Sequence, residues 1–172
     1  MKRILINDNN LNLDDIDYEV IRVKGIVMDS LKNVILVENN NTFQLPGGHI
    51  RKDESLEICL EREIKEELGI NLKIAQGPFM MITTYDNNYF DSGSKVCSKI
   101  YYYVILSDVE PDLNNLSLDA LEKETDFNIL KVNLSELDSF INNCLDNSSI
   151  DPKIGREMLL VIHEYNNLFG RD

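Results

Sequence analysis

One segment of the chain, residues 48–70, joins a glycine turn to a predicted helix with carboxylates where core residues are expected. Three apolar residues open the helix on one face: Leu56, Cys59 and Leu60. Steps of three and four residues continue this stripe to positions 63 and 67, and both are glutamates. Because helical residues lie about 100° apart, Glu63, Glu66 and Glu67 fall within one arc of about 100°. Their mutual repulsion disfavours ionisation, and a divalent cation is the simplest group that would offset it.

The length and charge of the chain limit its class. The 172 residues suit a single domain, 1–172, of a size that buries roughly 70% of its extended-chain surface. Lysine and arginine number 17 against 30 acidic residues, so the net charge is −13. This balance argues against binding to the backbone of polymeric nucleic acid or to an anionic membrane. A small phosphorylated ligand stays compatible, because a bound metal ion inverts the local field.

The cysteines and the first residues of the chain indicate a cytoplasmic protein. Cys59, Cys97 and Cys144 are odd in number and lack the spacing of a metal site. Cys59 and Cys144 lie on the apolar sides of predicted helices, so we expect both in the core. The first ten residues hold no apolar signal region, and no stretch approaches about 18 apolar residues. We therefore expect neither secretion nor a membrane span.

Short segments rich in β-branched residues alternate with turns along most of the chain. Asn- and Asp-rich clusters mark many of the turns, because their short side chains satisfy local backbone groups. The predicted strands cover residues 18–28, 33–38, 42–45, 72–75, 80–84, 100–106 and 129–132. A long acidic loop, residues 107–126, precedes the last of them.

Apolar spacing and capping residues predict three helices. They cover about 55–68, a segment that begins near residue 135, and about 152–169. Gly69 is the expected C′ residue of the first, Ser135 with Asp138 forms a capping box for the second, and Asp151 precedes Pro152 at the start of the third. The apolar face of the last helix suits packing onto a sheet, and a homodimer contact is the alternative. Together these elements predict an α/β layered domain with helices on both faces of a mixed sheet.

The spacing of residues within the segment 48–70 resembles a known signature. Gly48 lies six residues before Glu54, and Glu54 lies eight before Arg62. The remaining positions of the pattern follow directly: Glu63, Ile64, Glu66, Glu67, Gly69 and Ile70. The pattern is similar to the Nudix box, the 23-residue signature of the Nudix hydrolase superfamily, and every defining position matches.

The resemblance implies a Nudix-type α/β/α sandwich and a pyrophosphohydrolase that uses Mg²⁺ or Mn²⁺. Its substrate would be a small nucleotide, namely a nucleoside diphosphate linked to another group, as in a nucleoside triphosphate, a dinucleoside polyphosphate or a nucleotide sugar. Glu63, Glu66 and Glu67 would be catalytic metal ligands, and the Gly47 carbonyl would be a further ligand. Carboxylate and carbonyl oxygens are the ligands that both ions prefer.

Arg62 and Glu54 complete the residues that the resemblance marks for the catalytic site. They match positions that, in the family, hold the loop and helix in shape by ion pairing. The alternative is an exposed salt bridge, which contributes little to stability.

The general base stays open at this point. Some members of the family use the glutamate that matches Glu63, and others use an acid from the late loop. In this chain that acid would be Glu122 or Glu124. Asp119 and Asp126 lie in the same loop, and the spacing does not decide between the four.

The residues after the box leave the substrate open, and no substrate-binding residue is assigned. Tyr85 lies 15 residues past Ile70, close to where dinucleoside polyphosphate hydrolases carry a tyrosine. Tyr89 and Phe90 could stack on a nucleobase, and His49 could contact a phosphate. Ordinary packing or solvation explains each of these residues at least as well.

A non-catalytic Nudix module that senses a nucleotide is the alternative function. The complete glutamate set favours the enzyme, because a sensor has no need to retain every metal ligand. No additional region large enough for a DNA-binding domain accompanies the box. We therefore expect an enzyme that acts on a small molecule.

Overall fold

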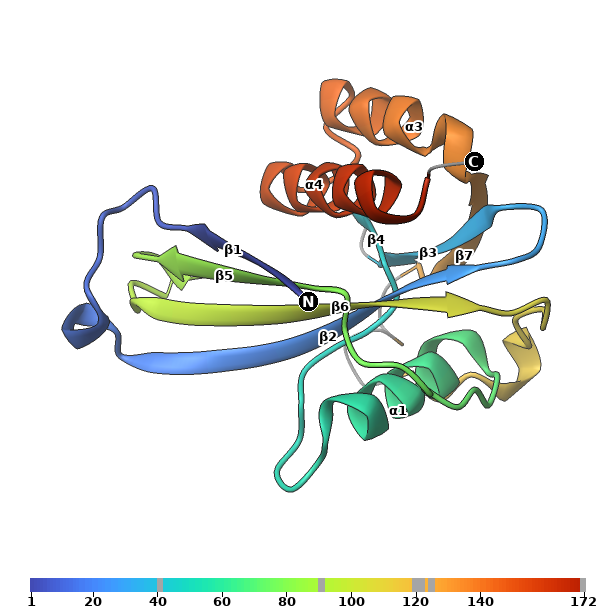
Figure 1. The fold of residues 1–172 in the computed structure, drawn as a ribbon, viewed down its shortest axis with the longest axis horizontal. Coiled ribbons are helices and arrows are strands. Elements are labelled where there is room, and N and C mark those ends of the chain that lie inside the picture. Colours follow the sequence, from blue (N-terminus) through green and yellow to red (C-terminus); the bar gives the residue numbers. More distant parts are fainter. Residues whose placement is uncertain (40–41, 90–91, 119–122, 124–125, 171–172) are drawn as a thin grey trace.

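The computed structural model describes residues 1–39, 42–89, 92–118, 123 and 126–170. In this part of the chain, one mixed sheet lies between α1 on one face and α3 with α4 on the other (Figure 1). The strands are β1 (Lys2–Ile6), β2 (Tyr18–Met28), β3 (Asn33–Asn39), β4 (Thr42–Gln44), β5 (Met80–Asp86), β6 (Val96–Leu106) and β7 (Asn128–Asn133). The helices are α1 (Leu56–Leu68), α3 (Leu134–Asp146) and α4 (Pro152–Phe169), with short 3-10 turns η1 (Leu13–Asp15) and η3 (Leu113–Asn115). The predicted α/β/α class is confirmed.

Strand β2 occupies the middle of the sheet. The strand order is β1-β5-β6-β2-β3-β4, and β7 pairs with β3. β2 runs parallel to β6 along its whole length, from Tyr18 opposite Val96 to Met28 opposite Leu106. β3 pairs with β2 at Met28, opposite Val34. Most of the second edge of β2 therefore pairs with a different segment, which carries the candidate site.

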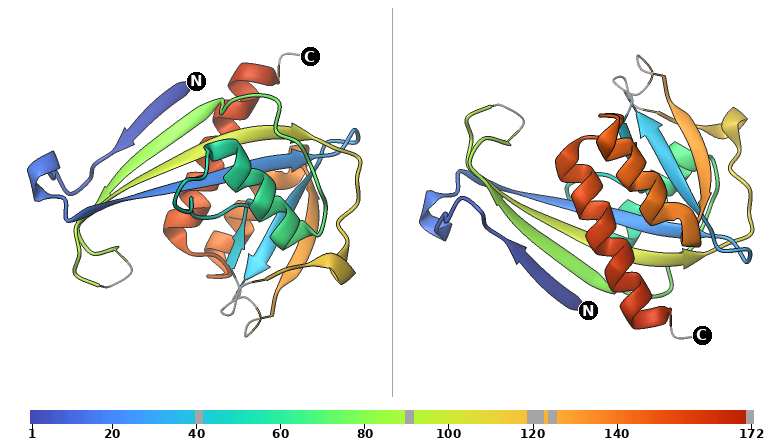
Figure 2. Two further views of the ribbon diagram at one scale, coloured as in Figure 1. Left: turned by 90° about the horizontal axis from the view of Figure 1, so that it is seen from below. Right: turned by 90° about the horizontal axis from the view of Figure 1, so that it is seen from above.

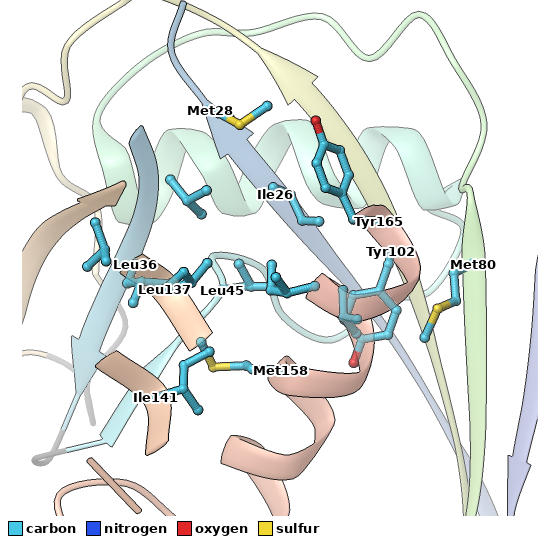
Figure 3. Close-up of a cluster of buried hydrophobic side chains, with 14 of the residues drawn as sticks. Ile26, Met28, Leu36, Leu45, Met80, Tyr102, Leu137, Ile141, Met158 and Tyr165 are labelled. Atoms are coloured by element: carbon cyan, nitrogen blue, oxygen red, sulfur yellow. The ribbon is translucent and has the colours of Figure 1, made fainter. Parts of the chain in front are cut away.

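Alternation along β2 directs side chains into two hydrophobic cores, one on each face of the sheet. Val23 is fully buried on the α1 side, in the same cluster as Leu60. Ile26 is fully buried on the opposite side, with Leu137 of α3 and Met158 of α4 (Figure 3). The two helical layers are seen from opposite directions in the two views of Figure 2. Both cores are needed to hold β2, because each uses alternate residues of the same strand.

Capping residues set the ends of α1 and the start of α4, and the sequence predicts two of them, Gly69 and Asp151. Ser55 Oγ accepts a hydrogen bond from the Ile58 backbone N–H at 3.2 Å. Gly69 follows the last residue of α1 with φ 70°, the left-handed conformation that favours glycine. Asp151 caps α4, and Pro152 is its first residue. In the described residues, no helix has the length and apolar character needed to cross a membrane.

The predicted strand at residues 72–75 is wrong. The structure shows no regular element there, although the segment packs against the core on the α1 side. The Ile74 backbone N–H donates to the Glu61 carboxylate at 2.9 Å, and Lys73 Nζ donates to the same carboxylate at 2.8 Å. The Ile74 N–H therefore donates to a side chain of α1 and not to the carbonyl group of a neighbouring strand. The segment packs against the helix and does not join the sheet.

Two further differences concern the strand β1 and the start of helix α3. β1 was not predicted, and it adds a parallel edge strand beside β5. The capping box predicted for the second helix is also wrong, because Asn133 caps α3 and its Oδ1 accepts from the Ser135 backbone N–H at 3.1 Å. α3 follows β7 with no intervening loop, so the helix begins one residue earlier than Ser135.

Candidate active site

The segment 46–50 lies along the second edge of β2 and carries the glycine turn. Three backbone hydrogen bonds attach it: from Gly25 N to Pro46 O (2.9 Å), from Val23 N to Gly48 O (3.0 Å) and from Ile50 N to Ile21 O (3.1 Å). These hydrogen bonds fix the turn to the central strand. Within this pairing, Arg22 and His49 lie opposite each other as an isolated antiparallel bridge. Loop residues anchored in this way can hold a ligand in place.

Gly47 and Gly48 permit close approaches that a side chain would obstruct. Gly47 has φ 134°, and a Cβ there would lie 2.2 Å from the Val23 carbonyl oxygen. A Cβ on Gly48 would lie 2.6 Å from the carboxyl carbon of Glu63. The missing side chains therefore let the turn touch β2 on one side and α1 on the other.

Glu67 is the buried member of the three glutamates, with 3% of the residue exposed. Its Oε2 accepts a hydrogen bond from the Gly47 backbone N–H at 2.8 Å. The structure thus brings together two of the predicted metal ligands, Gly47 and Glu67, although 20 positions separate them in the chain. A carboxylate that is both buried and charged requires polar or cationic partners of this kind.

Arg62 connects the other acidic residues of the segment. Its Nε and Nη2 donate to the two oxygens of Glu54 at 2.6 Å and 2.9 Å. Its Nη1 donates to Glu63 at 2.6 Å and to Glu66 at 2.9 Å. The side chains of Arg62 and Glu54 are 15% and 14% exposed, so the pair lies well out of solvent. The Arg62 hydrogen bonds lower the pKa of Glu54 to about 2, and Glu54 in turn raises the pKa of Arg62.

Glu63 and Glu66 differ in their surroundings. Burial raises the pKa of Glu63, and its hydrogen bond with Arg62 opposes that effect. Glu66 is more exposed and also receives Arg51 Nη2 at 3.3 Å, a contact that the sequence did not suggest. Burial of one carboxylate beside another creates a demand for positive charge at this end of α1.

Among the described residues, no three His, Cys, Asp or Glu side chains are gathered as in a preformed metal centre. The carboxylates of Glu63 and Glu66 are turned toward Arg62 instead. The donor set still fits Mg²⁺ or Mn²⁺ in its chemistry, since it consists of carboxylates beside a glycine turn. The space that a Cβ of Gly48 would fill lies directly against Glu63, on the side of the turn.

The first half of the acidic loop, residues 107–118, packs on the C-terminal end of α1. Three hydrogen bonds attach it: from Asp112 N to Leu68 O (2.9 Å), from Ser117 N to Glu66 O (2.8 Å) and from Asn115 Nδ2 to Gly69 O (2.9 Å). The candidate bases Asp119, Glu122 and Glu124 lie outside the described residues, and Asp126 is exposed. Ser117, whose backbone N–H bonds to the Glu66 carbonyl oxygen, precedes the first of these acids by two positions in the chain.

Two residues named from the sequence, His49 and Tyr89, both contact Arg22. His49 Nε2 accepts from Arg22 Nε at 3.0 Å, and Arg22 also donates to the Tyr89 hydroxyl. Partial desolvation of the ring and the nearby charges of Arg22 and Lys24 lower the pKa of His49 to about 4. Phe90 lies outside the described residues. A cation and an aromatic ring therefore flank the glycine turn at His49.

Two residues near the site were missed from the sequence. Arg51 pairs with Glu66, as described above, and nothing in its surface-like context distinguished it. Lys24 is 5% exposed and lies on β2 beside the turn. Its signal was present, because a lysine inside the apolar strand Tyr18–Met28 is a buried charge that needs partners.

A family model with the description NUDIX domain matches residues 20–141 of the chain. The matched part includes the glycine turn, α1 and the strands that carry them. The chain therefore belongs to the Nudix family. Enzymes of this family are pyrophosphohydrolases that act on small nucleotides and generally use divalent metals.

Solved structures share the fold at low sequence identity. The ORF135 protein of E. coli is 15% identical, with a TM-score of 0.58, over 94% of this chain and 100% of that chain. The MutT protein of Methanosarcina mazei Go1 is 18% identical, with a TM-score of 0.53, over 90% and 99%. The bifunctional NMN adenylyltransferase/ADP ribose pyrophosphatase of Francisella tularensis is 19% identical, with a TM-score of 0.57, over 85% and 42%. At these identities the likeness concerns the fold.

Proposed function

We propose that this protein is a Nudix hydrolase that requires Mg²⁺ or Mn²⁺ and cleaves a pyrophosphate bond in a nucleoside diphosphate linked to another group. The observation that carries the proposal is the contact between Gly47 and the buried Glu67, on the helix face that also holds Glu63 and Glu66. This contact joins the turn and the helix into one acidic surface that can receive a cation and, through it, phosphate oxygens.

Glu63, Glu66, Glu67 and the Gly47 carbonyl are the residues that would hold the cation. When bound, the cation would neutralise phosphate oxygens and lower the pKa of an attacking water. In this proposal Arg62 keeps its two hydrogen bonds to Glu54. The hydrogen bonds from its Nη1 to Glu63 and Glu66 would be replaced by contacts of these carboxylates with the cation. Arg62 and Glu54 thus maintain the shape of the segment, while Glu63 and Glu66 exchange Arg62 for the cation.

The general base is either Glu63 or an acid of the late loop, with Glu122 and Glu124 as the candidates. Glu63 is half-buried against Gly48, and burial raises its pKa, which makes its carboxylate a better proton acceptor than a free glutamate. The loop candidate is supported by the hydrogen bond from the Ser117 backbone N–H to the Glu66 carbonyl oxygen, which attaches the loop to α1 five positions before Glu122.

The substrate is a small nucleotide, with a nucleoside triphosphate, a dinucleoside polyphosphate or a nucleotide sugar as the candidates. The net charge of −13 disfavours polymeric nucleic acid as a partner. We further propose that the protein acts in the cytoplasm as a single domain, which suits its three buried cysteines, all of them free thiols. A homodimer is an additional proposal, tested by the mass of the purified protein in solution.

A non-catalytic module that senses a nucleotide is the second candidate. The ion pairs of Arg62 with Glu63 and Glu66 favour this candidate. Arg62 neutralises two of the carboxylates without a metal ion, and a site of this kind can be maintained in a protein that does not hydrolyse its ligand. The two candidates differ in whether any nucleotide is consumed.

The test of function is product release with Mg²⁺ from a panel of nucleoside triphosphates, ADP-ribose, NADH and dinucleoside polyphosphates. Turnover of at least one compound supports the enzyme. Binding of a nucleotide without turnover of any compound at high protein concentration supports the sensor.

Replacement of Glu67 by Gln tests the site. The amide can still accept the hydrogen bond from Gly47, but it no longer supplies a charge to the cation. We expect the rate of hydrolysis to fall at least about 100-fold in a protein that still folds. Glu61→Gln, on the same helix but paired with Lys73, is the matched control. Wild-type activity in the Glu67 variant would refute the assignment.

A further inference from the structure

A buried ammonium group, on Lys24, lies next to the candidate site and has no part in the proposed reaction. Lys24 is 5% exposed, in a stretch of β2 whose other residues are mostly apolar. Its Nζ donates to Gln44 Oε1 at 2.8 Å and to the Leu45 carbonyl oxygen at 3.3 Å. A buried charge costs several kcal/mol unless it is paired and hydrogen-bonded. The position of Lys24 is therefore maintained by specific partners.

Lys24 interacts electrostatically with carboxylates from two helices. Burial lowers the pKa of Lys24, and the charges of Glu157 on α4, Glu67 and Glu63 oppose that effect. Glu157 also accepts a hydrogen bond from the Tyr102 hydroxyl, on the neighbouring strand β6. Lys24 thus interacts with the charge of α4 on one face of the sheet and with the glutamates of α1 on the other.

The backbone on either side of Lys24 holds the glycine turn. The amides of Val23 and Gly25 donate to Gly48 and Pro46, as described above. Gly47 sits against the same strand, since a Cβ there would lie 2.9 Å from Lys24 Cα. The Lys24 side chain adds contacts to Gln44 and Leu45, the residues that lead into the turn.

The turn is therefore held from two directions. Lys24 holds it from β2, through Leu45 and Gln44, and Glu67 holds it from α1, through the Gly47 N–H. Lys24 and Glu67 carry opposite charges and bond to Leu45 and Gly47, which are two positions apart in the same short segment. Loss of either charge leaves the other buried with less compensation.

We propose that Lys24 is a positioning residue of this site: its ammonium holds the segment 44–48 against β2 and balances the buried charge of Glu67, so that Gly47 is in place before a cation arrives. The inference rests on the proposed function for the importance of Gly47. The order of the turn itself can be measured without turnover.

The test is the variant Lys24→Met, which keeps the length of the side chain and removes its charge. We expect amide hydrogen exchange at Gly47, Val23 and Gly25 to accelerate at least tenfold in the metal-free protein, measured by NMR. The value of kcat falls while KM changes little, because Lys24 acts on the turn and does not contact the substrate. Lys24→Arg keeps a charge and several donors, and it restores part of both properties.

Lys99→Met is the matched control, because Lys99 lies on the neighbouring strand β6 and pairs with Glu19. It removes one positive charge of the same kind, and exchange at Gly47 stays at the wild-type rate. Gln44→Leu is a second variant that removes the acceptor and leaves the charge of Lys24. It accelerates exchange at Gly47 by a smaller factor, and it decides the question if the Met variant does not fold.

Three results bear directly on the proposal. Unchanged exchange at Gly47 in a folded Lys24→Met protein overturns it, and so does a rise in KM with kcat unchanged, which would make Lys24 a substrate contact. Accelerated exchange in a protein that hydrolyses no nucleotide supports the positioning of the turn and counts only against the proposed hydrolase.

Discussion

At the scale of single residues, the candidate site depends on how closely the glycine turn approaches the glutamates of α1. Gly48 contacts Glu63 through the space that a side chain would fill, and Gly47 donates its N–H to Glu67. Arg62 meanwhile bonds with Glu54, Glu63 and Glu66 together. Substitution of a glutamate therefore changes the charge of the site, whereas substitution of a glycine changes the space available to the glutamates.

Gly48→Ala separates these two effects. A Cβ would lie 2.6 Å from the Glu63 carboxyl carbon, so the carboxylate has to move, whereas the backbone can stay in place. We expect folding to be retained and the affinity for Mn²⁺ to fall about tenfold, measured by titration calorimetry. Gly77→Ala, where no atom lies within 4 Å of an added Cβ, serves as the control. An unchanged affinity would show that Glu63 does not contribute to cation binding.

The pair of Arg62 and Glu54 gives the protein a defined sensitivity to acid. The pKa of Glu54 is about 2 in the folded protein, below the 4.5 of a free glutamate. A carboxyl with a lowered pKa stabilises the folded state above its unfolded pKa, and this contribution is lost as the pH falls from about 5 to about 2. Urea unfolding at several pH values should show this loss in the wild type. In Glu54→Gln the dependence over this range should be weaker.

The identities and much of the arrangement of these residues were predictable, because the box has a fixed spacing. Glu54 and Arg62 were expected to pair, and the structure places them in contact. Lys24 and Arg51 were not expected, because their roles depend on segments that are distant in the chain. The burial of Lys24 depends on Gln44 and Glu157, which no local pattern links to residue 24.

At the scale of elements, residues adjacent in the chain determine where the helices end, whereas packing between distant segments determines which segments become strands. Ser55, Gly69 and Asp151 act through their own backbone neighbours, so their positions could be found in the sequence. The segment 72–75 has the composition of a strand, but the Glu61 carboxylate captures its Ile74 amide. Only the packed structure shows that α1 competes with the sheet for that hydrogen bond.

Ser55→Ala tests the contribution of the cap to α1. The Ser55 hydroxyl satisfies the Ile58 amide at the start of the helix, and its loss should lower the free energy of unfolding by about 1 kcal/mol. Urea denaturation measures this value. Ser139→Ala, in the body of α3, is the control and should have a smaller effect. An equal loss in both variants would mean that the cap adds nothing specific.

At the scale of the whole molecule, cation binding and stability should be linked. A cation that binds the folded site and not the unfolded chain stabilises the protein by mass action. At a Mg²⁺ concentration about 100 times the dissociation constant, we expect the thermal midpoint to rise by about 5–10 °C. Scanning fluorimetry with and without Mg²⁺ measures this shift. Glu67→Gln should abolish most of it, and an equal shift in that variant would place the binding elsewhere.

The layered architecture was predictable from the alternation of strand and helix patterns, whereas the strand order was not. β2 pairs with β6 in the register of Tyr18 with Val96, and nothing near Tyr18 in the chain indicates this partner. β1 is an edge strand whose pairing with β5 depends on the rest of the sheet being formed. Pairings between distant segments are set by the whole sheet, so local sequence patterns do not reveal them.

The long parallel pairing of β2 with β6 also has a consequence for the order of events on the ribosome. The Nudix box and the two glycines of the turn emerge from the exit tunnel while β6 is still inside it, and the strand that anchors the turn then has one edge unpaired. The box is a local sequence, but its geometry depends on a partner that is synthesised later. A nascent chain should therefore be unable to form the site until β6 is outside the tunnel, and it gains the α4 carboxylate that faces Lys24 later still.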